Sequence, residues 1–153
     1  EAGLQILGVE EHSFFHLPEG GIGSGEAKRK VQDLLSSFKP DKIVLPSFLD
    51  NHTDHVAANE LLFRCDVSEM SEIWASEIWT PIFVNRLLDI TLVIEQKRKA
   101  IQAHASQLAS RNYEKAMLGL NQYRGESMGV GAYAEGYFVS PLKFYKELYK
   151  KTL

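Results

Sequence analysis

Apolar side chains recur at helical spacing in several parts of the chain. In residues 26–38, Ala27, Leu34 and Phe38 would lie on one face of a helix, and Ser24 is suited to cap its start. The polar positions between them fall on the opposite face, as expected for a helix at a protein surface. The same spacing predicts helices at residues 54–64, 92–110, 112–123 and 141–153, and the last turn of a helix at residues 4–8.

Shorter apolar runs predict strands between these helices. Residues 42–46, Lys-Ile-Val-Leu-Pro, have the pattern of a strand that is buried on both faces. Strands alternating with helices at this spacing are typical of an α/β sandwich with a mostly parallel sheet, which binds its ligands at the carboxyl ends of the strands. We therefore expect the ligand-binding and catalytic residues in the loop after Leu45. Further strands are predicted at residues 12–17, 72–80 and 87–91.

Composition narrows the possible functions. The chain has 153 residues, of which 44% are hydrophobic and 24% charged, as in an ordinary globular domain. Its net charge of −3 argues against nucleic acid and against an anionic membrane surface as partners. No apolar stretch approaches the roughly 18 residues of a membrane span. The single cysteine, Cys65, fits a reducing compartment, so we expect a cytoplasmic protein.

The loop after Leu45 concentrates groups that bind metals and transfer protons. Asp50, His52, Asp54 and His55 fall within six residues. An imidazole is a good ligand for zinc, and a second imidazole beside the metal can polarise a carbonyl group or shuttle a proton. Asp54 would orient an imidazole or simply cap the following helix. Histidines at this spacing are common in loops, and this loop supplies only one or two of the three protein ligands that a catalytic zinc takes.

Residues 43–46 followed by His52-Thr53-Asp54-His55 and an alanine-rich helix resemble the second signature of the LmbE-like, PIG-L-type deacetylases. Three further blocks resemble this family in the same order along the chain. The resemblance implies a single domain over residues 1–153 with a Rossmann-like three-layer α/β sandwich and a mostly parallel sheet. The further blocks are residues 17–20, residues 88–91 together with 97–107, and residues 129–137.

The resemblance also implies a reaction, the zinc-dependent removal of an N-acetyl group from an N-acetylglucosamine-type conjugate, a small molecule. In this family's pattern His55 would be a zinc ligand, and His52 would stabilise the oxyanion or protonate the leaving amine. Asp54 would support the imidazoles, and Tyr133 would be a further donor to the oxyanion or merely a packing residue. Glu19 and Asn51 are the expected substrate contacts.

The family's first signature, His-Pro-Asp-Asp, does not occur in this sequence, and Thr53 replaces the usual proline of the second. We therefore expect the first strand, part of the first helix and the remaining zinc ligands to lie upstream of Glu1. The truncated chain would then be inactive by itself. Without that strand, residues 42–46 would leave an unpaired edge.

Two other interpretations remain open. The chain would be a non-catalytic binding module that has lost its metal site, or an unrelated metal-dependent hydrolase that uses the same loop. Aromatic residues near Trp74 and Tyr145 suggest a possible homo-oligomer.

Overall fold

The computed structural model describes residues 1–18, 20–109 and 112–152. The chain divides into two compact units, one made of Glu1–Phe14 and Leu87–Gly136, the other of Phe15–Arg86 and Tyr137–Leu153. Its strands form a four-stranded sheet in the order β1-β2-β4-β3. The strands are β1 (Lys42–Pro46), β2 (Glu72–Ser76), β3 (Arg86–Asp89) and β4 (Ala134–Pro141).

The sheet is mostly antiparallel, so the expectation of a mostly parallel sheet is wrong. Strand β1 pairs with β2 in parallel, with Lys42 opposite Glu72. Strand β4 runs antiparallel to β2. It also runs antiparallel to β3. The Asn85 N–H donates to the Tyr137 carbonyl at one end of the pair and the Ile90 N–H to the Tyr133 carbonyl at the other, both over 3.0 Å. The mixed α/β class is confirmed, but a Rossmann-like three-layer arrangement is not.

Strand β4 makes the sheet mostly antiparallel, and the sequence pattern does not predict this strand. Its residues alternate between buried and half-buried, but the buried positions at its start are Ala134 and Gly136. Small residues on the buried side leave no apolar alternation to recognise. The strand lies between β2 and β3 and reverses the direction of the pairing.

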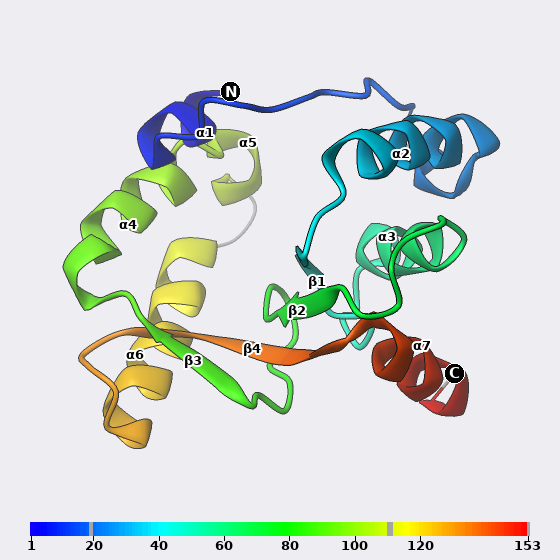
Figure 1. Ribbon diagram of the computed structural model, residues 1–153. Helices are drawn as coiled ribbons and strands as arrows, with labels where there is room; N and C mark the ends of the chain where they lie inside the picture. The colour runs from blue at the N-terminus through cyan, green and yellow to red at the C-terminus, as the bar shows by residue number, and fades with distance from the viewer. Residues whose placement is uncertain (19, 110–111, 153) are drawn as a thin grey trace. The chain divides into compact units, whose positions relative to one another are not determined.

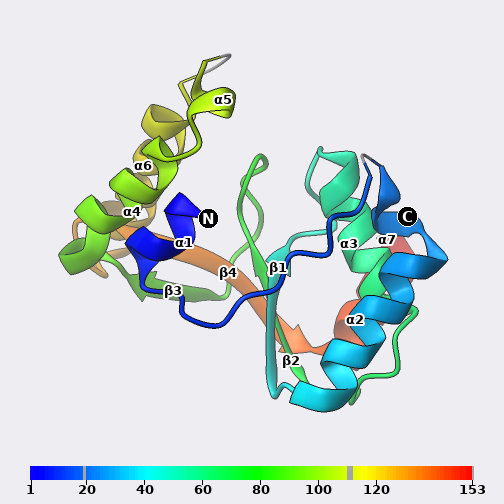
Figure 2. The ribbon, with the colours of Figure 1, turned by 90° about the horizontal axis from the view of Figure 1, so that it is seen from above.

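The unit that contains β1 and β2 has its helices on one side of these strands, as both views show (Figures 1 and 2). Helix α2 (Gly25–Phe38) begins at Ser24 as predicted, and the Ser24 Oγ accepts the Ala27 N–H over 3.1 Å. The other two are α3 (Thr53–Phe63) and α7 (Leu142–Thr152), and a short 3-10 turn covers Gly21–Gly23. The buried core comprises Leu45, Phe48, Leu62, Ile73, Ala75, Leu142 and Tyr145.

Strand β1 is not buried on both faces. Leu45 faces the core and is 9% exposed, whereas Val44 on the opposite face is 64% exposed. Within the described residues β1 pairs only with β2, so it forms one edge of the sheet. The strand expected upstream of Glu1, which would pair with this edge, stays a prediction.

The other unit packs helices against the paired ends of β3 and β4. Helix α1 (Ala2–Leu7) ends at Gly8, whose φ of 72° is the left-handed conformation that glycine adopts easily. Both views show α1 beside α4 (Ile94–Gln102), where the Gln96 side chain donates to the Ile6 carbonyl over 2.8 Å (Figures 1 and 2). Helix α6 (Tyr113–Met128) contributes Leu118 to a small core with Ile90 and Ile94.

Three predicted elements differ from the structure. The strand predicted over residues 72–80 ends at Ser76. Residues 12–17 form no strand, since none of the described residues supplies a ladder for them and His16 has a φ of 48°. The predicted helix over residues 92–110 is divided into a 3-10 turn (Thr91–Val93), α4 and a short α5 (Ala105–Leu108). Among the described residues, no helix combines the length and apolar character needed to span a lipid bilayer.

Candidate functional site

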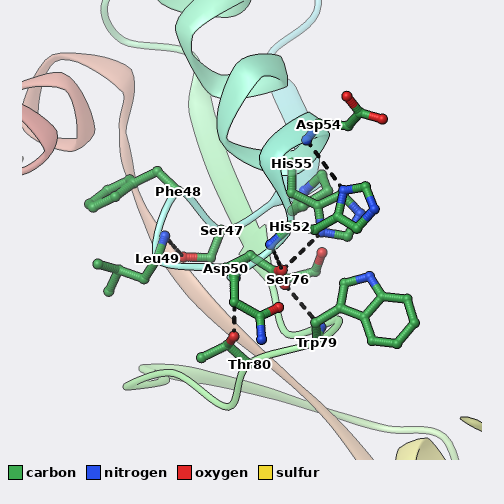
Figure 3. A network of polar contacts seen from close by, with 12 residues as sticks. Ser47, Phe48, Leu49, Asp50, His52, Asp54, His55, Ser76, Trp79 and Thr80 are labelled. Atoms are coloured by element: carbon green, nitrogen blue, oxygen red, sulfur yellow. Dashed lines mark hydrogen bonds and ion pairs between the residues drawn. The ribbon is translucent and has the colours of Figure 1, made fainter. Parts of the chain in front are cut away.

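The loop after β1 is held rigidly at the carboxyl end of that strand (Figure 3). Ser47 and Phe48 are buried, and the Phe48 N–H donates to the hydroxyl oxygen of Tyr145 in α7 over 3.2 Å. Burial raises the pKa of Tyr145 to about 12, so its phenol stays neutral. The loop therefore begins at buried residues whose position is fixed by this hydrogen bond.

Asp50 is the centre of the polar network in this loop. Its side chain is only 1% exposed. Oδ1 accepts the backbone N–H of His52 over 3.0 Å, and Oδ2 accepts the backbone N–H of Trp79 over 2.9 Å. Oδ1 also lies 3.2 Å from the Nδ1 of His55. One buried carboxylate thus joins both histidines to the loop that follows β2 (Figure 3).

His52 caps the N-terminus of α3 with its ring. Its Nδ1 accepts the backbone N–H of Asp54 over 3.2 Å, which satisfies one of the unpaired donors of the first turn. The residue is exposed. Its ring lies nearly parallel to the indole of Trp79, at 15° and with 6.3 Å between the centroids. Packing and capping together fix the direction of this imidazole.

His55 lies in the first turn of α3, next to His52. The two ring centroids are 4.8 Å apart, and the side chain of His55 is 20% exposed. Its Nδ1 is buried and makes no hydrogen bond of good geometry, although the Asp50 carboxylate is 3.2 Å away. We interpret this contact as a close but bent pairing, because no other described group partners this nitrogen.

Asn59 fixes α3 relative to β1. The side chain is completely buried, and its amide nitrogen donates to the carbonyl of Pro46 over 2.9 Å and to that of His55 over 2.8 Å. The end of the strand and the first turn of the helix are therefore tied to the same group. This places the histidine pair at the carboxyl end of β1, as predicted.

The remaining predicted site residues are Asn51, Glu19 and Tyr133. The backbone N–H of Asn51 donates to the Oγ1 of Thr80 over 3.3 Å, and its exposed side chain adjoins the histidines in sequence. Glu19 lies outside the described residues. Tyr133 belongs to the other unit, where it is half-buried against the Ile90 cluster. Within one unit the structure therefore brings together His52, His55 and Asn51.

Asp50 is the organising residue that the sequence pattern failed to single out. Asp54 was a candidate to orient an imidazole, but the carboxylate beside the His55 ring is that of Asp50. A signal existed, because Asp50 accepts the N–H two residues ahead, as in the Asx turns that aspartate favours. No signal marks Trp79, since Asp50 binds its backbone and not its side chain.

The donors fit one position of a metal site, not a complete one. The second ring nitrogen of His55, with a carboxylate at the first, has the arrangement of a metal-binding imidazole. The described residues include no group of three His, Cys, Asp or Glu side chains that would hold a metal ion. A catalytic zinc takes three protein ligands, so this part of the chain does not account for one.

Comparison with known proteins places the loop in a recognised family region. Residues 1–65 match the family described as PIG-L: GlcNAc-PI de-N-acetylase. This segment includes Asp50, His52 and His55, and the match confirms the resemblance seen in the sequence. It does not extend to Tyr133.

Solved structures share the fold. A conserved protein of Thermus thermophilus superposes with a TM-score of 0.72 at 22% identity, over 89% of this chain and 68% of that one. The 4-carboxy-2-hydroxymuconate hydratase of Pseudomonas putida gives 0.67 at 22%, over 90% and 68%. The N,N'-diacetylchitobiose deacetylase of Pyrococcus horikoshii gives 0.66 at 23%, over 94% of this chain but only 62% of its own. At these identities the likeness establishes the fold alone.

Proposed function

We propose, from the match of residues 1–65 to the PIG-L family, that this protein takes part in removing an N-acetyl group from an amino-sugar conjugate. The observation that carries the proposal is the pair of adjacent imidazoles beside a buried carboxylate at the carboxyl end of β1. This pair lies inside the matched segment. A diacetylchitobiose deacetylase among the structural neighbours is compatible with the same chemistry.

The proposed chemistry depends on which ring nitrogen of His52 can donate a hydrogen bond to the substrate. Amide hydrolysis places negative charge on the carbonyl oxygen, and a fixed N–H donor that meets this charge lowers the barrier. His52 has its Nδ1 occupied as an acceptor, so its Nε2 can carry the proton that stabilises the oxyanion. In this neutral form the ring stabilises the oxyanion and does not protonate the leaving amine, because loss of the Nε2 proton would leave an imidazolate.

A metal would add a second source of stabilisation. We propose that His55 is one ligand of a zinc ion and that the remaining ligands come from outside the described residues. Bound zinc polarises the carbonyl group and lowers the pKa of a coordinated water. Asp50 would hold the His55 ring in place for this role. Chelation should then abolish activity, and added zinc should restore it.

The proposed substrate is a small acetylated amino-sugar conjugate in the cytoplasm. Asn51 and Glu19 are proposed to contact the sugar, and Tyr133 to donate to the oxyanion. The hydratase among the neighbours has the same fold, so the fold by itself does not fix the reaction. A non-catalytic binding module is the alternative that an assay must exclude.

Acetate release by the full-length protein tests the proposal. N-acetylglucosamine conjugates are the substrates, and His52→Ala is compared with the unaltered protein. Loss of the N–H donor should lower kcat by about 10²–10³-fold. The matched control is His12→Ala, which changes an exposed histidine of the other unit. No acetate release, or equal rates for the two variants, would refute the proposed function.

A further inference from the structure

We propose that the site holds its two imidazoles as opposite neutral tautomers, with Asp50 as the positioning residue that fixes His55. His52 would then present an N–H, and His55 a lone pair, from neighbouring rings. The inference rests on the proposed function for its catalytic meaning. The tautomers themselves follow from the contacts of this loop and can be measured without any substrate.

The tautomer of His52 follows from its cap. A backbone N–H is always a donor, so the nitrogen that accepts it must have no proton. The Asp54 N–H lies 3.2 Å from Nδ1 of His52. A neutral His52 therefore carries its proton on Nε2. A proton on Nδ1 instead would break the cap and leave a backbone donor unpaired at the helix start.

The tautomer of His55 follows from the neighbouring carboxylate. An ionised carboxylate can only accept, and its Oδ1 lies 3.2 Å from the buried Nδ1 of His55. A lone pair on this nitrogen would face negative charge with no donor in reach, because no other described group partners Nδ1. The proton therefore belongs on Nδ1, and the lone pair of Nε2 is left available.

Asp50 is well placed to enforce this difference. The carboxylate is itself fixed by the backbone N–H groups of His52 and Trp79, at 3.0 and 2.9 Å, and it is almost fully buried. It therefore cannot turn away from the His55 ring without losing both bonds. The rings, 4.8 Å apart, thus present different groups: an N–H donor from His52 and, from His55, a lone pair of the kind that binds a metal ion.

Nitrogen NMR of the imidazoles tests the proposal directly. The protein is studied free of metal at several alkaline pH values, and spectra in which each ring shows one protonated and one unprotonated nitrogen are compared. Long-range ¹H–¹⁵N correlation distinguishes a protonated ring nitrogen from an unprotonated one. We expect the proton on Nε2 in His52 and on Nδ1 in His55. The same tautomer in both rings would overturn the proposal.

Asp50→Ala tests the role of the carboxylate. It removes the acceptor beside Nδ1, so the His55 proton should move to Nε2 while His52 stays unchanged. Acetate release should fall about 10- to 100-fold in kcat, with little change in KM. The exposed Asp33→Ala on α2 is the matched control and should change neither.

The outcomes separate this proposal from the proposed function. If the His55 proton stays on Nδ1 in Asp50→Ala, Asp50 does not position it and the inference is wrong. If Asp50→Ala does not fold, the tautomers of the unaltered protein still decide. Opposite tautomers in a protein that releases no acetate would uphold the inference and refute the deacetylase.

Discussion

At the scale of single residues, Tyr145 links the core to the site loop. The side chain is 1% exposed, and its ring packs against Phe48 with 5.0 Å between the centroids. Its hydroxyl oxygen also accepts the Phe48 N–H. The sequence places Tyr145 in a predicted helix and among the aromatic residues that suggest a homo-oligomer. That its oxygen fixes the loop before Asp50 emerges only from the folded chain.

Tyr145→Phe should destabilise the protein by about 1–3 kcal/mol, because it leaves the buried Phe48 N–H without an acceptor. Urea unfolding measures the loss. Tyr123→Phe is the matched control, since Tyr123 is 63% exposed and should change the free energy of unfolding little. Equal effects of the two substitutions would contradict the role of the Tyr145 hydroxyl.

The same residue predicts a pH dependence of stability. Folding raises the Tyr145 pKa from about 10 to about 12, so the unfolded chain loses this proton first. Its contribution to stability is complete below about pH 10 and is lost as the pH rises toward 12. Urea unfolding at several alkaline pH values should show this decline in the unaltered protein and a shallower one in Tyr145→Phe.

At the scale of elements, helix α6 lies unusually close to the segment before β4. A Cβ added at Gly125 would lie 2.5 Å from the Gly131 carbonyl oxygen and 2.6 Å from the Tyr133 nitrogen. These are backbone atoms, so they cannot move aside cheaply. A glycine within a helix normally costs stability, and here it permits the close approach.

Gly125→Ala should therefore destabilise the protein by about 1–3 kcal/mol, as overpacking does. Gly119→Ala is a matched control on the same helix, where the added Cβ would meet nothing within 4 Å. That change should be neutral or stabilise by up to about 1 kcal/mol, because alanine is the better helix former. Urea midpoints of the two variants should shift in opposite directions or differ clearly, and similar losses would refute the argument.

At the scale of the whole molecule, the two units share strand β4. Residues 134–136 of this strand belong to one unit and residues 137–141 to the other. The strand forms backbone hydrogen bonds in each, through Tyr137 to Asn85 in one and through the adjoining Tyr133 to Ile90 in the other. Loss of either unit would therefore strip the strand of part of its pairing.

We expect the two units to unfold in a single cooperative transition for this reason. Both tryptophans, Trp74 and Trp79, lie in one unit, so their fluorescence reports on that unit alone. Far-ultraviolet circular dichroism reports on the helices of both. Coincident urea transitions by the two methods are the expected result, and separate midpoints would show that the units unfold independently.

The sequence by itself determined the features that depend on residues close together in the chain. Helix α2 with its Ser24 cap, strand β1, the end of α1 at Gly8 and the histidines at the start of α3 all follow from spacing, capping and turn chemistry within a few residues. The family resemblance also lay in such local motifs. The helix, caps and turn were predictable because neighbouring residues supply their interactions, and β1 was predictable because a short apolar run marks a strand whatever its partner is.

Tertiary structure decided everything that depends on partners distant in the chain. The direction of the sheet was set by β4, whose buried positions include Ala134 and Gly136 and so give no apolar pattern. Asp50 gained its role from the Trp79 backbone, which lies 29 residues further along the chain. A carboxylate is placed by the groups that satisfy its hydrogen bonds, and here the sequence identifies only those close to it.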